Sequence, residues 1–278
     1  MKMAQIFPEN SYKLKALSYQ EIVKACENST TVTGRVVKIL SEFKELLVAF
    51  DDVKSIDELN CSTICGYLPF DQVSIYPDKY SKDPNRKSPI TVGILLGKKV
   101  RVKITEVTVN RITLSRKKNM EEAYEHLCGC TSTNFYVTSL TTYNAFGDIG
   151  EGITARLNIK EATKARIKNI AEIVRPKDVI RVSLLKHNSE KCFEVSYKQL
   201  FKEFNPNDYF KGMAVRGVVN EPTNMSYTAF YISLTPQVSG ILDVTSWMPE
   251  LRYGDTVECS VSRVTERGLN LTFLKLIE

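Results

Sequence analysis

Hydrophobic and polar residues alternate along much of this chain in short runs rich in β-branched residues, a pattern that predicts strands. Three such runs, each with a Ser or Thr near its end, close three similar stretches of sequence. They occupy residues 111–117, 193–198 and 269–274. The repeat length of about eighty residues exceeds the roughly 20 to 50 residues of a solenoid unit and fits a small separate β-barrel. The sequence therefore predicts an all-β fold of three tandem barrels.

This strand pattern divides the chain into an N-terminal extension and three barrels. The extension covers residues 1–30, and the barrels cover residues 31–118, 131–200 and 208–278. At 278 residues the chain is long enough for two or three domains, and a hydrophobic content of 43% is enough for packed cores.

Short helices are expected in the extension and around the barrels. Ser18 and Glu21 form a capping box ahead of an apolar run, which predicts a helix there. Asn119 is the expected N-cap of a helix that connects the first two barrels. Residues 160–174 also have helical spacing of their apolar positions.

Charge is distributed unevenly over a chain whose formal net charge is +6. An excess of this size permits an anionic partner without requiring one. Residues 207–278 contain 6 Lys and Arg against 8 Asp and Glu, a local balance of −2. We therefore expect the first two barrels to form the electrostatic side of the molecule, and the third to bind anions weakly or to bind protein instead.

Targeting and redox signals point to the cytoplasm. The first six residues lack the apolar segment of a secretory signal, and no run approaches the roughly 20 apolar residues of a membrane span. The seven cysteines are expected to be reduced thiols. The spacings of Cys61 to Cys65 and of Cys128 to Cys130 are not those of a zinc ribbon or knuckle. Neither a metal nor a cofactor is expected.

An aromatic corner recurs between the first and second strands of the repeats. Repeats two and three share the pattern Tyr-x-Ala-Phe, at residues 143–146 and 227–230, and Phe43 begins a weaker version in repeat one. Exposed rings at such a corner stack on unpaired bases. The alternative is that both rings belong to ordinary barrel core, since Phe is usually buried. A basic, polar loop at residues 76–89 offers Tyr76 and Tyr80 as further stacking rings, unless it is only a solvated connection.

Catalysis has little support in the sequence. The chain has two histidines, His126 and His187, and neither has a recognisable nucleophile or metal partner near it, so both are expected to face solvent. No glycine-rich loop of the kind that cradles phosphates is present. These observations predict a protein that is not an enzyme.

The order of these motifs resembles the S1-type RNA-binding domain of bacterial ribosomal protein S1. The matching stretches are residues 66–69 and 111–117 in repeat one, 143–146, 148–150 and 156–159 in repeat two, and 227–230, 240–244 and 253–257 in repeat three. The resemblance implies five-stranded Greek-key barrels of the OB type, joined by short helices, whose face around strands two and three binds single strands.

No repeat is complete by this comparison. Asn158 replaces the histidine of the family, and Asp243 stands at the same position in repeat three. Repeat two is therefore the expected main RNA-binding module. Carried over by position, the RNA-binding residues are Phe43, Arg111, Tyr143, Phe146, Asn158, Lys191, Tyr227, Phe230 and Arg267.

The resemblance implies a non-catalytic protein that binds single-stranded RNA, messenger RNA in translation, with a ribosomal or other protein contact through barrel 3. The alternative is a protein-interaction scaffold of degenerate barrels with weak or no RNA binding. A third hypothesis, an RNA-processing enzyme, needs a catalytic domain that this sequence does not contain.

Overall fold

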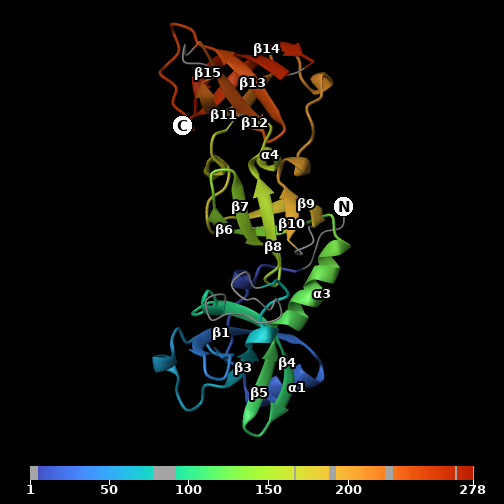
Figure 1. Cartoon of the computed structure of the whole chain (residues 1–278). Coiled ribbons are helices and arrows are strands. Elements are labelled where there is room, and N and C mark those ends of the chain that lie inside the picture. The colour runs from blue at the N-terminus through green and yellow to red at the C-terminus, as the bar shows by residue number, and fades with distance from the viewer. Residues whose placement is uncertain are drawn as a thin grey trace. The chain divides into compact units, whose positions relative to one another are not determined.

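The strands form three closed barrels of five strands each (Figure 1) in a computed structural model of the chain. The structure describes residues 6–77, 92–165, 167–187, 192–222, 228–266 and 268–277. The all-β fold of three tandem OB-type barrels with short helices, expected from the alternating pattern and the resemblance, is confirmed.

The first barrel has the strand order β1-β2-β3-β5-β4, with β3 and β5 parallel and the other neighbours antiparallel. Its strands are β1 (Thr31–Leu40), β2 (Glu45–Ala49), β3 (Cys65–Pro69), β4 (Lys99–Thr108) and β5 (Arg111–Ser115). Alternate side chains of β2 and β3 point inward, so Leu46, Val48 and Leu68 have no exposed surface. The residues between them, such as Tyr67, face outward.

The second barrel has the order β10-β8-β7-β6-β9. Its strands are β6 (Ser132–Leu140), β7 (Asn144–Asp148), β8 (Thr154–Asn158), β9 (Val179–His187) and β10 (Phe193–Ser196). The chain separates into two compact units that share these strands. The first unit contains Met1–Tyr136, Asp148–Ala155 and His187–Phe193, and the second contains Val137–Gly147, Arg156–Lys186 and Glu194–Glu278.

The third barrel repeats the order of the first, as β11-β12-β13-β15-β14 with β13 and β15 parallel. Its strands are β11 (Ala214–Pro222), β12 (Ala229–Thr235), β13 (Val238–Asp243), β14 (Thr256–Thr265) and β15 (Gly268–Leu276). A cluster of buried side chains fills the barrel, with Ile232, Leu242 and Val257 among the fully buried ones.

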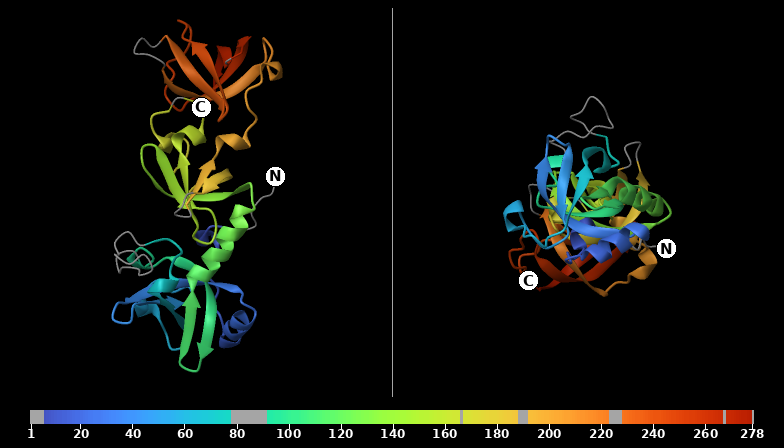
Figure 2. Two further views of the ribbon diagram at one scale, coloured as in Figure 1. Left: turned by 45° about the vertical axis from the view of Figure 1, so that its right-hand side comes forward. Right: turned by 90° about the horizontal axis from the view of Figure 1, so that it is seen from below.

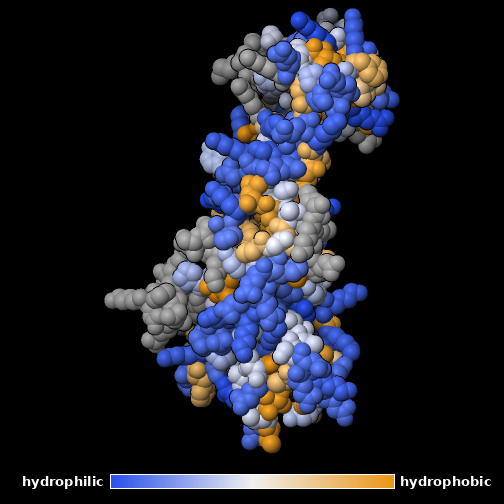
Figure 3. Space-filling model, turned by 90° about the vertical axis from the view of Figure 1, so that its right-hand side faces the viewer, coloured by the Kyte–Doolittle hydropathy of each residue, from blue (hydrophilic) through white to orange (hydrophobic). Residues whose placement is uncertain are grey.

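The helix in the N-terminal extension is confirmed as α1 (Tyr19–Glu27). Ser18 and Glu21 make the predicted capping box, and Ile22 and Ala25 are buried. The helix lies against β4 of the first barrel (Figure 2). None of the described helices is long and apolar enough to cross a membrane. In the view of Figure 3, hydrophilic residues cover most of the surface.

The connecting helix begins earlier than predicted. It is α3 (Arg116–Cys128), and its N-cap is Ser115, whose hydroxyl accepts a hydrogen bond from the backbone N–H of Lys118 at 3.1 Å. The prediction that Asn119 caps this helix is wrong, because the last residue of β5 already supplies the cap. Asn119 lies inside the helix and is buried.

The helix predicted over residues 160–174 is also wrong. Two short elements occupy this stretch, α4 (Ile159–Ala162) and the 3-10 helix η4 (Ile170–Glu172). Asn158 caps the first, and Asn169 with Glu172 forms a capping box on the second. The capping box of Asn169 and Glu172 starts a new helical element inside the predicted range, so a single helix does not form there.

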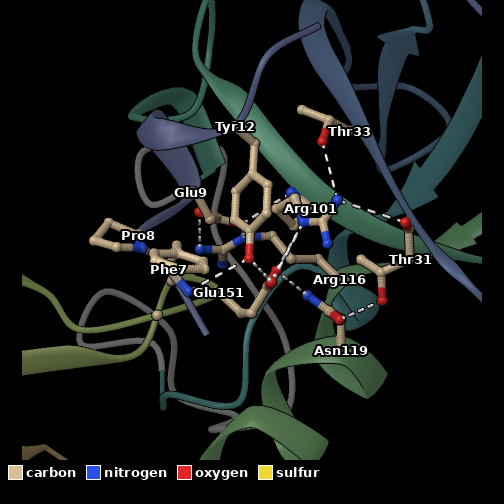
Figure 4. A network of polar contacts seen from close by, with 12 residues as sticks. Phe7, Pro8, Glu9, Tyr12, Thr31, Thr33, Arg101, Arg116, Asn119 and Glu151 are labelled. Atoms are coloured by element: carbon tan, nitrogen blue, oxygen red, sulfur yellow. Dashed lines mark hydrogen bonds and ion pairs between the residues drawn. The ribbon is translucent and has the colours of Figure 1, made fainter. Parts of the chain in front are cut away.

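A buried ionic network holds the N-terminal segment in the first unit (Figure 4). Glu9, in the 3-10 helix η1 (Glu9–Ser11), accepts hydrogen bonds from Nε and Nη2 of Arg116 at 2.8 and 2.7 Å. Both side chains are more than nine-tenths buried. The backbone N–H of Glu9 donates to Oδ2 of Asp148 at 2.7 Å, at the point where β7 ends and the turn to β8 begins. One glutamate thus joins the extension, α3 and this turn.

Glu151, in the same turn, is the second centre of the network. Its carboxylate accepts hydrogen bonds from the Tyr12 hydroxyl at 2.7 Å, from Nε of Arg101 at 3.0 Å and from Nδ2 of Asn119 at 2.7 Å. The Arg101 guanidinium also lies 3.9 Å from the centre of the Tyr12 ring. The acidic turn that the resemblance marked at residues 148–150 is therefore occupied by contacts within the protein.

Asp148 lies in this network without a direct ion pair to either arginine among the described contacts. Its Oδ1 accepts hydrogen bonds from the backbone N–H groups of Gly150 and Gly152, at 2.8 and 3.1 Å. Burial raises the pKa of Asp148 to about 7, and the nearby charge of Glu9 adds to the effect. The turn therefore contains a carboxyl group that titrates near neutral pH.

Candidate nucleic-acid interface

Tyr143 and Phe146 are exposed aromatic residues on the second barrel. Tyr143 precedes β7 and Phe146 lies within it, and 61% and 37% of their respective surfaces are accessible to solvent. Ala145 between them is fully buried. The alternation along β7 therefore places Ala145 in the core and Phe146 on the outer face, where an aromatic ring can stack on a base.

The outer face continues onto β8. Nδ2 of Asn158 donates a hydrogen bond to Oδ1 of Asn144 at 3.0 Å, which marks these two residues as neighbours across β7 and β8. In an antiparallel hairpin this register places Phe146 opposite Arg156, two residues along each strand. Arg156 is exposed. The face thus has a ring beside a guanidinium group, a combination that suits bases and phosphates.

A carboxylate neutralises the cations of this face. Glu194 of β10 pairs with Arg156 through one oxygen and with Nζ of Lys186 through the other, the latter at 3.3 Å. The hydrogen bond from Arg156 and the charge of Lys186 lower the pKa of Glu194, so it is ionised at neutral pH. A phosphate that binds here has to compete with Glu194 for both cations.

Asn158 uses much of its hydrogen-bonding capacity within the protein. Besides the bond to Asn144, its Oδ1 accepts from the backbone N–H of Lys160 at 3.0 Å and so caps α4. One N–H of the side-chain amide remains for a ligand. The role of Asn158 in RNA binding stays a prediction. Its structural role is to cap α4 and to bond Asn144 across the two strands.

The first barrel has a cavity of about 290 Å³ on the corresponding face, lined by Leu40, Phe43, Glu45, Tyr67, Asn110 and Arg111. The predicted residues Phe43 and Arg111 therefore come together. The Phe43 ring is 72% exposed, and the Arg111 guanidinium lies 4.8 Å from the centre of the Tyr67 ring. Arg111 also forms an ion pair with Glu45. Among these residues, sequence reasoning missed Glu45 and Tyr67 as parts of the site.

The third barrel does not repeat the arrangement of the second. Phe230 pairs with the fully buried Leu242 and packs against the barrel core, so it takes the inner position that Ala145 has in β7. The outward pair in barrel 3 is Tyr231 and Ile241. The role of Phe230 in RNA binding stays a prediction. Tyr231 takes the outward place that the sequence pattern gave to Phe230.

Near Phe230 the third barrel has an apolar groove of about 440 Å³, lined by Phe230, Val244, Met248, Pro249, Glu250, Leu251 and Tyr253. Val244 and Tyr253 are about half exposed. Among the described residues that line it, Glu250 alone has a charged side chain. Exposed Asp243 adjoins Val244 in sequence. The groove therefore combines apolar surface with negative charge, unlike the face of barrel 2.

Three predicted RNA-binding residues, Lys191, Tyr227 and Arg267, lie outside the described residues. Tyr80, expected as a stacking ring, also lies outside the described residues. Tyr76, expected as another, is engaged within the first unit. Its hydroxyl accepts a hydrogen bond from the backbone N–H of Thr154 at 2.7 Å, and burial raises its pKa to about 12. Tyr76 is therefore not available for stacking in this structure.

The outward residues Arg156, Glu194 and Tyr67 were not among the predicted site residues. A signal for two of them was present, because Tyr67 and Arg156 each precede a buried leucine in the third strand of their barrel. Strict alternation assigns such neighbours to the opposite face. For Glu194 the signal was the same alternation, between Phe193 and Val195.

Within the described part of the chain, no group of three His, Cys, Asp or Glu side chains is placed to hold a metal ion. The imidazole of His187 is exposed, as expected, and its Nδ1 lies 2.8 Å from the Tyr124 hydroxyl. His126 is also exposed.

Three OB-type barrels with outward aromatic residues agree with the fold that the resemblance to S1-type domains implied. The chain is 30% identical over 128 residues to the small ribosomal subunit protein bS1c of Spinacia oleracea, which is 45% of this chain and 28% of that protein. It is 26% identical over 208 residues to bS1 of Rhizobium meliloti, which is 72% of this chain and 35% of that protein. The resemblance to the S1-type RNA-binding family is thereby confirmed.

The chain spans about a third of the length of these curated relatives. No family model matches it. Among solved structures, a multidomain protein with nucleic acid binding domains from Streptococcus pneumoniae aligns over 89% of this chain and 74% of its own, at 10% identity and a TM-score of 0.27. At that score the alignment says nothing about function.

Proposed function

We propose that this protein binds single-stranded RNA without catalysis, with the second barrel as its main contact. The observation that carries the proposal is the exposure of Tyr143 and Phe146 on one barrel, with exposed Arg156 on the neighbouring strand β8. The sequence similarity to ribosomal S1 proteins supports the same reading. Each stacked base contributes roughly 1–3 kcal/mol with little dependence on base identity.

We further propose that the RNA is messenger RNA and that the setting is translation in the cytoplasm. Both relatives are small ribosomal subunit proteins, which supports a ribosomal contact for this chain. Linked barrels increase the effective concentration of one another along the same strand. Crosslinking the bound RNAs in cells and sequencing them should recover coding regions of many messages. Recovery of one dedicated RNA would contradict the translation role.

The binding test is a fluorescence-anisotropy titration of the full chain with a labelled single-stranded RNA of about 20 nucleotides, at two salt concentrations. Binding should weaken with salt, because Lys and Arg contacts to phosphate release counterions. The double variant Tyr143→Ala with Phe146→Ala should weaken binding by about thirtyfold or more, since the loss of two stacked bases costs roughly 2–6 kcal/mol.

A matched control removes exposed rings elsewhere. Tyr19 on α1 and Phe210 between β10 and β11 are 51% and 67% exposed. The double variant Tyr19→Ala with Phe210→Ala should bind RNA as the parent does. No RNA binding at low salt, or equal losses in the two double variants, would contradict the proposal.

The groove of barrel 3 favours a second function, docking of a protein. Its apolar lining, with Glu250 in it and Asp243 nearby, suits a peptide that inserts an apolar side chain flanked by Lys or Arg. A labelled peptide of alternating Leu and Lys should bind the full chain, and Tyr253→Ala should weaken that binding without changing RNA affinity. Unchanged peptide binding in Tyr253→Ala would exclude the groove as the docking site.

A further inference from the structure

The cavity on barrel 1 combines aromatic surface with a nearly buried carboxylate. Phe43 and Tyr67 supply rings, and the Arg111 guanidinium lies over the Tyr67 ring. Glu45 is 8% exposed and lines the same cavity. A planar ligand that enters the cavity therefore meets ring faces and an acidic edge together.

Glu45 can only accept hydrogen bonds from a ligand. A carboxylate has no donor, and one of its oxygens already receives the Arg111 guanidinium. Within the described chain, no hydrogen bond reaches the other oxygen, Oε2. A ligand that covers Oε2 without donating a hydrogen bond to it removes this oxygen from water uncompensated, and binding then bears the full cost of that desolvation. The ligand edge that fits best therefore presents N–H groups toward Glu45.

Guanine presents the most suitable edge among the four RNA bases. Its N1–H and N2–H groups are adjacent donors that one carboxylate can accept together, whereas uracil places a carbonyl oxygen on each side of its N3–H. Adenine and cytosine offer one amino group beside an acceptor nitrogen. A carboxylate attracts the N1–H and N2–H edge of guanine and repels the carbonyl oxygens of uracil.

We propose that barrel 1 selects an unpaired guanine, with Glu45 accepting hydrogen bonds from its Watson–Crick edge and with Tyr67 and Phe43 in contact with its ring. This inference rests on the proposed RNA binding and adds the identity of a base. It also distinguishes the barrels. By strand position, Asn144 and Arg156 stand in barrel 2 where Glu45 and Tyr67 stand in barrel 1.

Barrel 2 therefore has no carboxylate at the strand position of Glu45. Asn144 already uses its side-chain oxygen to accept from Asn158, so barrel 2 offers no equivalent acceptor for a base edge. Barrel 2 stacks bases without this selection, and barrel 1 adds the discrimination.

The test uses the full chain carrying Tyr143→Ala and Phe146→Ala, which leaves barrel 1 as the main site. Labelled RNAs of about five nucleotides, near the smallest site of one OB barrel, have a central guanine, inosine, adenine or uracil in otherwise identical uracil sequences. Guanine should bind roughly tenfold more tightly than uracil. Inosine lacks only the N2 amino group, so it should bind between the two.

Two variants locate the selection. Glu45→Gln should reduce the preference for guanine over inosine and uracil to less than twofold. Arg111→Gln breaks the same ion pair but keeps the carboxylate, so it should weaken binding to all four RNAs and preserve their order. Circular dichroism melts of both variants identify any loss of folding.

Equal binding of the four RNAs would overturn the inference while leaving RNA binding intact. A preference that survives Glu45→Gln in a folded protein would overturn it as well. Absence of binding to every RNA, by this chain and by the parent, would instead overturn the proposed function on which the inference rests.

Discussion

Phe230 of β12 lies directly opposite Leu242 of β13, a side chain with no exposed surface, and packs with the core of the third barrel. Directly paired residues share a face, so the next pair, Tyr231 and Ile241, faces outward. Phe230→Ala should therefore destabilise barrel 3 by about 2 kcal/mol, less than the roughly 3–5 kcal/mol of a fully buried Phe. Denaturant unfolding measures this effect.

The companion variant Tyr231→Ala should leave stability nearly unchanged. Any contribution of barrel 3 to RNA binding should fall in Tyr231→Ala and persist in Phe230→Ala, as measured by anisotropy. The reverse pattern would show that Phe230 turns outward in solution and that the strand pairing differs from this register.

Releasing the cations of the second barrel should strengthen RNA binding. Glu194 neutralises Arg156 and Lys186, so Glu194→Gln should tighten binding roughly fivefold at low salt and steepen the salt dependence. Glu258 offers a matched control, because it pairs with Arg216 and Lys275 on the third barrel. If Glu258→Gln gives the same gain, the effect comes from net charge and not from the barrel 2 face.

A methyl group at Gly152 should disrupt the buried network. Gly152 has a φ of +80°, and a Cβ there would overlap Nη2 of Arg116. Gly212 has a φ of +89° with no atom within 4 Å of such a Cβ. Gly212→Ala should therefore cost about 1 kcal/mol for its backbone conformation alone. Gly152→Ala should cost roughly 3–5 kcal/mol more, the usual effect of breaking a buried ion pair.

Thermal unfolding followed by circular dichroism compares the two glycine variants under identical conditions. Because their backbone costs match, the difference between them isolates the displacement of Arg116. Equal melting temperatures would mean that the guanidinium moves aside at no cost, and the network would then contribute little to stability.

Asp148 should make the stability of the first unit depend on pH. Its pKa is raised to about 7 in the folded protein, mainly by burial, against about 4 in the unfolded chain. The folded state therefore binds the proton more tightly, and the contribution is complete below about pH 4 and is lost as the pH rises through 7. Denaturant unfolding at intervals from pH 5 to pH 8 should show this loss.

The variant Asp148→Asn tests the assignment. It removes the titration and also the acceptor for the backbone N–H of Glu9, so its stability should be lower at every pH. The difference from the parent should change between pH 5 and pH 8. Parallel curves for the two proteins would assign the pH dependence to another group.

The barrels could be predicted from the sequence because their signals are local. Alternation along strands such as β2 and β3 reflects which side chains are buried, and the capping box of Ser18 and Glu21 lies within four consecutive residues. Tyr143 and Phe146 were placed correctly on the surface for the same reason, since Ala145 between them is the small inward residue.

The parts that could not be predicted depend on partners distant in sequence. The motif Tyr-x-Ala-Phe is identical in repeats two and three, yet the pairing with β13 turns Phe230 inward. Glu9 and Asp148 are separated by 139 residues. Neither Glu9 nor Arg116 carries a local pattern that distinguishes it from a solvated charge. Their burial is a property of the folded unit alone.

The position of Glu9 makes the N-terminal segment part of the interior of the first unit and not a dispensable tail. Proteolysis after Tyr12 would leave the guanidinium of Arg116 enclosed without its counterion, in a medium where an unpaired charge is costly. Water would have to enter between α3 and the β7–β8 turn to solvate it. A single cut near the start of the chain would thus loosen residues more than a hundred positions away.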